Sequence, residues 1–225
     1  MTVRHTWLGA LALTVVAVGT AVGTAVAAVA VSETVRKVQE RYDATHDFTA
    51  DVTQEMTIAS LGKTVTSHGH VAFKKPGKMR WELTQDDHQL IVADGTTLWF
   101  YQPGEQQVLK APFDAAFRSS TPISFLTGVG RIAQDFDVQS DGESPDGQLL
   151  YLLLVPRHES SDVGKLRLSV ARDGYDIRGA EVHDPLGNVS RLRFEHIRRN
   201  VGLTDDQFVF QVPPGVDVIT APIGQ

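Results

Sequence analysis

The sequence of 225 residues contains no cysteine. This absence excludes disulfide bonds, thiolate zinc sites, a cysteine nucleophile and a lipid-modified N-terminal cysteine. Basic side chains are also outnumbered, because 21 Lys and Arg residues face 27 Asp and Glu residues, and the formal net charge is −6 at pH 7. Proteins that bind nucleic acid usually carry a basic surface, so this acidity argues against a nucleic-acid partner.

The common catalytic motifs are missing as well. The chain has no Gly-x-Ser-x-Gly elbow, no P-loop and no Gly-x-Gly-x-x-Gly after an expected strand. His68 and His70 would share one face of a strand, but no third metal ligand stands nearby in the sequence, so we interpret them as solvated side chains. Asp86 and Asp87 fit a solvated turn better than acid/base chemistry. We therefore expect no enzymatic activity, no metal and no cofactor.

One long stretch without Asp, Glu, Lys or Arg stands out in this acidic chain. It covers residues 6–31, follows a short basic N-terminus, and ends in two small-x-small sites at residues 25–27 and 28–30. This order is typical of a secretory signal peptide over residues 1–30, cleaved after Ala27 or Ala30. The alternative is an uncleaved membrane anchor, since a stretch of this length could span a bilayer. In either case residues 31–225 are exported, and we expect them to form a single domain.

The exported part begins with a helical period and then changes to a strand period. Val35, Val38 and Tyr42 recur at i, i+3 and i+7, which predicts an amphipathic helix from Glu33 to about Ala44 with Ser32 as its N-cap. Apolar and polar residues then alternate between turns, and Asp-Gly, a strong hairpin signal, occurs four times, at residues 94, 141, 146 and 173. We predict about eleven short strands in an antiparallel sheet that curls toward a barrel. The expected strands start near Phe48, Val71, Met79, Gln89, Thr97, Gln106, Phe136, Leu149, Lys165, Ile177 and Ser190.

Residues 112–128 interrupt this strand pattern. Phe113 and Phe117 share one helical face, and Thr121-Pro122 supplies the N-cap and first position of a second short helix. Two expected strands, Leu98–Tyr101 and Leu149–Val155, are apolar on both faces and must be covered on both. The N-terminal helix could cover one face and these two short helices the other. Such a fold could enclose a cavity for an acyl chain, or it could be a filled core that binds nothing, and periodicity does not separate these alternatives.

Taken together, these segments resemble the LolA family of periplasmic lipoprotein carriers. The matching pieces follow one another in the family order through nearly the whole exported chain. They are Phe48-Thr49-Ala50 with Gln54, residues 69–81 (GHVAFKKPGKMRW), Asp94-Gly95 with residues 98–101 and Pro103, Gln107-Val108, Thr121-Pro122 with Leu126, residues 172–174 (RDG), and the closing Phe208-x-Phe210-x-x-Pro213-Pro214-Gly215-Val216.

The resemblance implies a mainly β fold with helices, an unclosed antiparallel barrel of eleven strands with a helical lid over an apolar cavity. It also implies a function without catalysis in the periplasm. The cavity would shelter the acyl chains of a lipoprotein that an inner-membrane transporter releases, and the carrier, which we expect to be a monomer, would pass them to an outer-membrane receptor. Burying an acyl chain is worth about 0.8 kcal/mol per CH₂, so such chains need cover in an aqueous compartment.

The expected binding residues are apolar side chains assigned by strand face and family position. Those expected to line the cavity are Phe48, Val52, Phe73, Trp81, Leu98, Phe100 and Leu152, and those expected on the lid are Phe113, Phe117, Ile123, Phe125 and Leu126. LolA proteins typically carry an arginine tied to lid closure and cargo transfer just before the proline where this chain has Lys75. Lysine offers a point charge instead of a planar fork, so the resemblance leaves Lys75 as a candidate for the same role with an altered contact.

Two other functions remain open at this point. One is an anchored or periplasmic regulatory domain of the same fold that senses a lipid, and it gains weight if residues 1–30 stay on the protein. The other is a carrier of a different amphiphile, such as a glycolipid.

Overall fold

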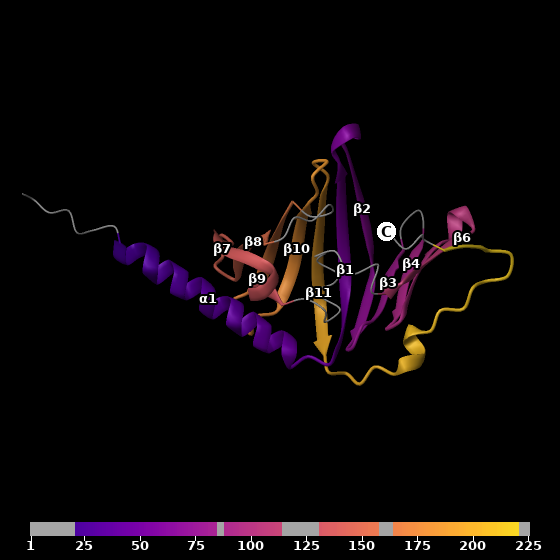
Figure 1. Cartoon of the computed structure of the whole chain (residues 1–225), viewed down its shortest axis with the longest axis horizontal. Coiled ribbons are helices and arrows are strands. Elements are labelled where there is room, and N and C mark those ends of the chain that lie inside the picture. The colour runs from indigo at the N-terminus through magenta and orange to yellow at the C-terminus, as the bar shows by residue number, and fades with distance from the viewer. Residues whose placement is uncertain (1–20, 85–87, 114–130, 158–163, 221–225) are drawn as a thin grey trace, which may run out of the picture.

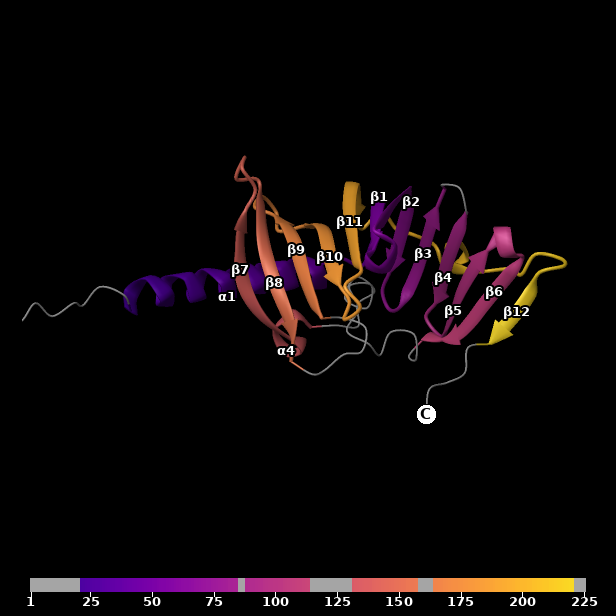
Figure 2. The ribbon, with the colours of Figure 1, turned by 90° about the horizontal axis from the view of Figure 1, so that it is seen from above.

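The computed structural model describes residues 21–84, 88–113, 131–157 and 164–220. These residues form one strongly curved sheet of twelve strands with the order β12-β6-β5-β4-β3-β2-β1-β11-β10-β9-β8-β7 (Figures 1 and 2). The strands are β1 (Asp47–Ile58), β2 (Lys63–Lys74), β3 (Lys78–Leu83), β4 (Gln89–Asp94), β5 (Thr97–Gln102), β6 (Gln107–Pro112), β7 (Phe136–Glu143), β8 (Leu149–Pro156), β9 (Lys165–Ala171), β10 (Ile177–His183), β11 (Val189–Arg199) and β12 (Asp217–Thr220). The ends of this order, β12 and β7, do not pair, so the barrel is open, as the resemblance implied.

All eleven expected strands are present, and ten begin within one residue of the expected position, whereas β2 begins at Lys63, eight residues before Val71. The hairpin signals explain most of the boundaries. Asp94-Gly95, Asp146-Gly147 and Asp173-Gly174 each lie between two antiparallel neighbours. The pair at Asp141-Gly142 is different, because it lies inside β7, where the pairing with β8 shifts register between Ser140 and Glu143. Gly142 has φ +88°, which suits a bulge. This fourth Asp-Gly pair therefore bends a strand instead of ending one.

The twelfth strand was not predicted. β12 pairs with β6 in parallel, whereas every other pairing of the sheet is antiparallel. The chain reaches β12 through residues 200–216, which include the short 3-10 helix η3 (Asp205–Phe208) packed against β3 and β4. Figure 1 shows this segment leaving β11, passing β3 and β4, and returning to β6.

The helix α1 (Ala21–Asp43) is longer than the sequence predicted. It already includes Ala21, and it runs through Ser32 without a break, so Ser32 is not an N-cap. Residues 21–31 are Ala, Val, Gly and Thr without proline, and alanine is the best helix former, so nothing in this stretch ends a helix. The short helix α4 (Ile132–Asp135) was also not predicted from the sequence. Among the described residues, no helix is long and apolar enough to cross a membrane.

The core lies on the concave side of the sheet. It gathers buried residues from β1, β2, β3, β4, β7, β8, β9, β10 and β11, together with Val35 and Val38 of α1. A smaller buried group lies on the convex side, where Val92 and Val108 of β4 and β6 are fully buried and Phe208 of η3 is 1% exposed. Beside them, the ring of Phe210 lies 5.6 Å from Trp99 and 5.8 Å from Tyr101, centroid to centroid. The C-terminal segment therefore covers the convex face of β5, a cover that was not expected from the sequence.

Candidate functional site

All seven residues expected to line the cavity lie on the concave face of the sheet. Val52, Phe73, Trp81 and Leu152 are buried, whereas Phe48, Leu98 and Phe100 are half-buried. The strand register explains this common direction, because directly opposed residues of an antiparallel pair point to the same face. Trp81 opposes Ile91, which in turn opposes Phe100. Leu152 opposes Leu168, and Val52 opposes Phe194.

Aromatic rings line the middle of this face. Phe48 and Phe73 stack with their centroids 4.8 Å apart, and Phe73 meets Trp81 edge-on at 6.3 Å. Trp81 meets Phe194 in the same edge-on way, also at 6.3 Å. Sequence reasoning did not select Phe194, although the alternation of Leu192 and Phe194 with polar neighbours carried the same signal as in the other strands. These rings form a continuous apolar surface across β1, β2, β3 and β11.

The helix α1 covers part of this apolar face. Val35 is 7% exposed and Val38 is 1% exposed, and both belong to the concave core. Figures 1 and 2 show α1 running across the half of the sheet that contains β7–β11. Leu152 of that half belongs to the same buried core as Val35 and Val38.

Lys75 contacts the C-terminal end of this helix. Its Nζ donates a hydrogen bond to the carbonyl oxygen of Tyr42 and lies 3.6 Å from the centroid of the Tyr42 ring. A cation at this position also meets the negative end of the helix dipole. Burial lowers the pKa of Lys75, while the nearby Asp43 carboxylate acts in the opposite direction. The family resemblance singled out Lys75. Its ammonium group thus connects the β2–β3 turn to the end of α1.

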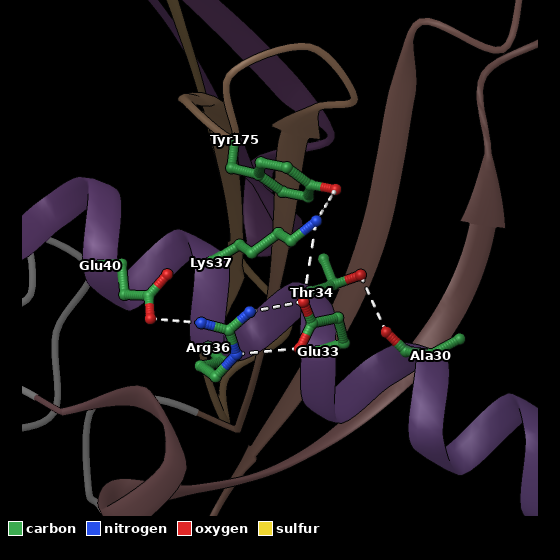
Figure 3. A network of polar contacts seen from close by, with 7 residues as sticks. All are labelled: Ala30, Glu33, Thr34, Arg36, Lys37, Glu40 and Tyr175. Atoms are coloured by element: carbon green, nitrogen blue, oxygen red, sulfur yellow. Dashed lines mark hydrogen bonds and ion pairs between the residues drawn. The ribbon is translucent and has the colours of Figure 1, made fainter.

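Two further cations attach α1 to the β9–β10 turn. Lys37 donates a 3.3 Å hydrogen bond to the Tyr175 hydroxyl, and this bond raises the pKa of Lys37 (Figure 3). Arg41 donates a 2.6 Å hydrogen bond from Nε to the carbonyl of Gly174, and the same nitrogen lies 3.4 Å from Asp176. The Asp176 carboxylate also pairs with Arg199 of β11. We call Lys37, Arg41 and Lys75 the α1 latch; sequence reasoning identified only Lys75, because the partners of the other two lie more than 130 residues away.

Two hollows flank α1. The first is a cavity of about 60 Å³ beside Tyr42, lined by Phe48, Phe73 and Phe194 and by Lys75 at its edge. The second is an open groove of about 780 Å³ between α1 on one side and α4 and β7 on the other. The cavity is too small for an acyl chain, whereas the groove falls within the range of about 300–1,000 Å³ that is usual for small-molecule sites.

Of the residues expected on the lid, only Phe113 lies in the described part of the chain. It is 6% exposed and belongs to the concave core, and its ring lies close to Gly77, where a Cβ atom would be 3.1 Å from Phe113 Cζ. Gly77 has φ +66°, so a side chain there would also be strained. Phe117, Ile123, Phe125 and Leu126, with the two short helices expected around them, lie outside the described residues.

The two histidines considered as a metal pair have other partners. His68 Nδ1 lies 3.0 Å from the Thr53 hydroxyl, and His70 Nδ1 lies 2.6 Å from an oxygen of Asp51. The other Asp51 oxygen lies 2.7 Å from Nδ1 of His196, and these hydrogen bonds, that of His196 foremost, lower the pKa of Asp51. In the parts of the chain that the structure describes, no group of three or more His, Asp or Glu residues is placed to hold a metal ion.

The molecule is thus an open, curved sheet, antiparallel except for β12, with an apolar concave face that one helix partly covers. This arrangement defines the class of half-barrel folds. The chain belongs to the LolA family, described as "Outer membrane lipoprotein carrier protein LolA", whose pattern matches residues 43–211.

Two relatives support this membership, and one solved structure shares the fold. An outer-membrane lipoprotein carrier protein from Methylobacillus flagellatus is 32% identical over 168 residues, which are 73% of this chain and 78% of the relative. The protein of the same name from Nitrosomonas europaea is 36% identical over 151 residues, 67% of this chain and 71% of the relative. The crystal structure of an uncharacterized conserved protein from Thermus thermophilus has the same fold, with a TM-score of 0.54 and 14% identity over 84% of this chain and 98% of that one.

Proposed function

We propose that this protein is a periplasmic carrier that shelters the acyl chains of lipoproteins on the concave face of its sheet and takes them from the inner membrane to the outer membrane. An inner-membrane transporter would load it and an outer-membrane receptor would unload it, with no catalytic step. The observation that carries the proposal is the apolar concave face, with Phe48, Leu98 and Phe100 only half-buried, lying next to a helix that polar contacts hold in place. Family membership and the names of the relatives support the same function.

The energetics of such a carrier fit this arrangement. Each buried CH₂ group is worth about 0.8 kcal/mol, so an acyl chain gains a large free energy when it leaves water for an apolar surface. In the half of the sheet that contains β7–β11 the concave face is already packed against α1 through Val35 and Val38, so acyl chains that extend from β1–β5 into that half would have to displace the helix. Releasing α1 requires breaking the few polar contacts of the α1 latch as well as this packing. Such a carrier can exchange cargo without unfolding its sheet.

The test is displacement of a bound fluorescent apolar probe by a diacylated lipopeptide. We expect the protein to shield the probe and the lipopeptide to displace it. Leu98→Ser should weaken probe binding about 5- to 10-fold, because it removes part of an apolar contact worth about 1.5–3 kcal/mol. Leu153→Ser is the matched control, since Leu153 opposes Arg167 on the other face of the sheet and is also half-buried. A protein that shields no probe, or that responds equally to both variants, would contradict the proposal.

A second candidate is an anchored regulatory domain that senses a lipid. The observation in its favour is that α1 continues without a break through both proposed cleavage sites, Ala27 and Ala30. Cell fractionation separates the two functions. We propose cleavage of residues 1–30, so a shortened protein should appear with the periplasmic contents, whereas a full-length protein in the membrane fraction would favour the sensor.

A further inference from the structure

The groove between α1 and β7 combines an apolar floor with a cationic rim. Its floor contains Val35 and Phe136, which are buried, and Val31 and Val138, which are half-buried. Gln39, Gln134 and Gln139 line its sides without adding charge. On α1 the lining extends from Val31 to Glu40, a helical length of about 14 Å at 1.5 Å per residue. An apolar trough suits the hydrocarbon chain of an amphiphile, and a chain longer than this stretch of α1 would extend past its end.

The charged residues that line the groove are three arginines and one glutamate. Arg36 is neutralised within α1, because its guanidinium pairs with Glu33 and with Glu40 (Figure 3). Arg157 pairs with Asp137 at 2.8 Å, and its Nε donates a 3.2 Å hydrogen bond to the carbonyl of Phe136. The Arg157 and Asp137 side chains are about half exposed, and an ion pair this exposed contributes little free energy, so an anionic ligand can compete for the guanidinium. Arg131 has an exposed guanidinium with no hydrogen bond or ion pair to another described residue. Among the described residues of the rim, the Arg131 guanidinium is therefore the unpaired positive charge, and the Arg157 guanidinium is held only by an exposed ion pair and one carbonyl.

Backbone contacts connect Arg131 and Arg157, which both line the groove, to the short helix α4. Arg131 is the N-cap of α4, and the backbone N–H of Arg157 donates a 2.9 Å hydrogen bond to the carbonyl of Asp135, the last residue of that helix. Both guanidinium groups thus start from the two ends of one short helix that itself borders the groove. Guanidinium groups bind carboxylates and phosphates through paired hydrogen bonds.

We propose that this groove binds an amphiphile with a single acyl chain in the trough and an anionic head group, a carboxylate or a phosphate, on Arg131 and Arg157. The inference rests on the proposed function, because it specifies a kind of lipid that the carrier holds beside α1 while the helix is docked. It also goes beyond that function, since apolar burial alone would not discriminate between charged and neutral head groups. The carrier then prefers anionic amphiphiles.

The test compares three ligands with the same sixteen-carbon chain by titration calorimetry on the purified protein, below the concentrations at which they form micelles. Palmitate carries a carboxylate, lysophosphatidylglycerol carries a phosphate, and monopalmitin is neutral. We expect at least one anionic ligand to bind ten times more tightly than monopalmitin, and the comparison of the two anions identifies the source of the charge. Equal affinity for all three ligands would overturn the inference.

Variants locate the effect in the groove. The double variant Arg131→Gln with Arg157→Gln should reduce the preference for anions to less than twofold and leave monopalmitin binding unchanged. Arg131→Gln alone should lower anion affinity at least threefold, and it keeps the test valid if the double variant does not fold, because its side chain makes no hydrogen bond or ion pair within the described structure. Arg198→Gln is the matched control, since Arg198 borders a different hollow beside Asp51 and His196. A preference for anions that persists in the double variant would overturn the assignment.

The proposed function is tested separately by the lipopeptide. If the lipopeptide displaces the apolar probe but anions show no preference, the carrier function stands and the head-group inference fails. If anions bind through Arg131 but the lipopeptide displaces no probe, the head-group site stands and lipoprotein carriage fails.

Discussion

The contact between Lys75 and Tyr42 leads to a prediction about how firmly α1 is held. The variant Lys75→Met keeps most of the side-chain volume but removes the ammonium group. It therefore loses the hydrogen bond to the Tyr42 carbonyl and the contact with the Tyr42 ring. If this contact holds the end of α1 on the sheet, the last turn of the helix should open more often in the variant.

The size of the effect follows from the two contacts and their cost. A hydrogen bond from a charged donor contributes about 1.5–3 kcal/mol, and a cation over an aromatic ring contributes about 0.5–2 kcal/mol. Burial of the ammonium group opposes both, as the lowered pKa of Lys75 indicates. We therefore expect a net loss of about 1–3 kcal/mol, which is a 5- to 150-fold increase in the opening equilibrium.

Native-state hydrogen exchange of the amides in residues 38–43 measures this opening. Lys75→Met should lose protection there and keep it in the central strands, and the apolar probe should bind faster by a similar factor. Lys75→Arg should stay within about threefold of the natural protein, because arginine can also donate to a carbonyl and stack on a ring. Lys63→Met is the control, since Lys63 is exposed at the start of β2. Unchanged protection in Lys75→Met, or equal loss throughout the sheet, would refute the reasoning.

Three further predictions concern other parts of the fold. Lys74 and Lys78, each 2.6 Å from Asp205, lower its pKa from 3.8 to about 2, so this carboxylate stabilises the docked η3 above pH 4 and loses its effect as the pH falls through 2. NMR signals of residues 205–210 should report this release, and Asp205→Asn should remove its pH dependence. The buried Asp47 carboxylate accepts hydrogen bonds from the backbone N–H groups of residues 201–203, so Asp47→Asn should lower the free energy of unfolding by about 1.5–3 kcal/mol in urea titrations. Gly69→Ala should destabilise by more than about 3 kcal/mol or prevent folding, because a Cβ atom would lie 1.9 Å from the carbonyl oxygen of Glu82, as thermal melts can show.

Each of these three has an outcome that would count against it. If η3 is still released at low pH in Asp205→Asn, another titrating group must cause the release. A fully stable Asp47→Asn would mean that the amide replaces the carboxylate as an acceptor without loss. A stable Gly69→Ala would require β2 and β3 to separate locally, which their backbone hydrogen bonds oppose.

The sheet was predictable because its signals are local. Alternation along each strand and Asp-Gly between strands require only neighbouring residues, and they located all eleven antiparallel strands. The pair at Asp141-Gly142 shows the limit of such signals, because a glycine with positive φ can serve either a bulge or a hairpin turn. β12 could not be found in this way, since its four residues are all exposed and pair only with the distant β6.

The candidate site was also predictable only where its signals are local. Facing directions follow from alternation, so the seven residues expected at the cavity share one side of the sheet. What covers each face depends on contacts between distant segments. Phe208 and Phe210 were noticed only as part of a family pattern, and nothing local indicates that they cover Val92 and Trp99. For the same reason, no local pattern indicates that Arg41 reaches Gly174.

The position of α1 on the concave face bears directly on how tightly a carrier of this design can hold its cargo. In the proposed function, helix and acyl chains compete for one apolar surface, so the apparent dissociation constant is the intrinsic one divided by the fraction of molecules with α1 displaced. Each 1.4 kcal/mol in the contacts of α1 therefore weakens cargo binding about tenfold. The contacts of the α1 latch together contribute a free energy on the order of a few times 1.4 kcal/mol. This is smaller than the free energy gained by burying an acyl chain, so the latch weakens cargo binding without preventing it. A carrier with a weaker latch would bind more tightly but release poorly, and one with a stronger latch would fail to load, so the strength of the latch sets the balance between loading and release.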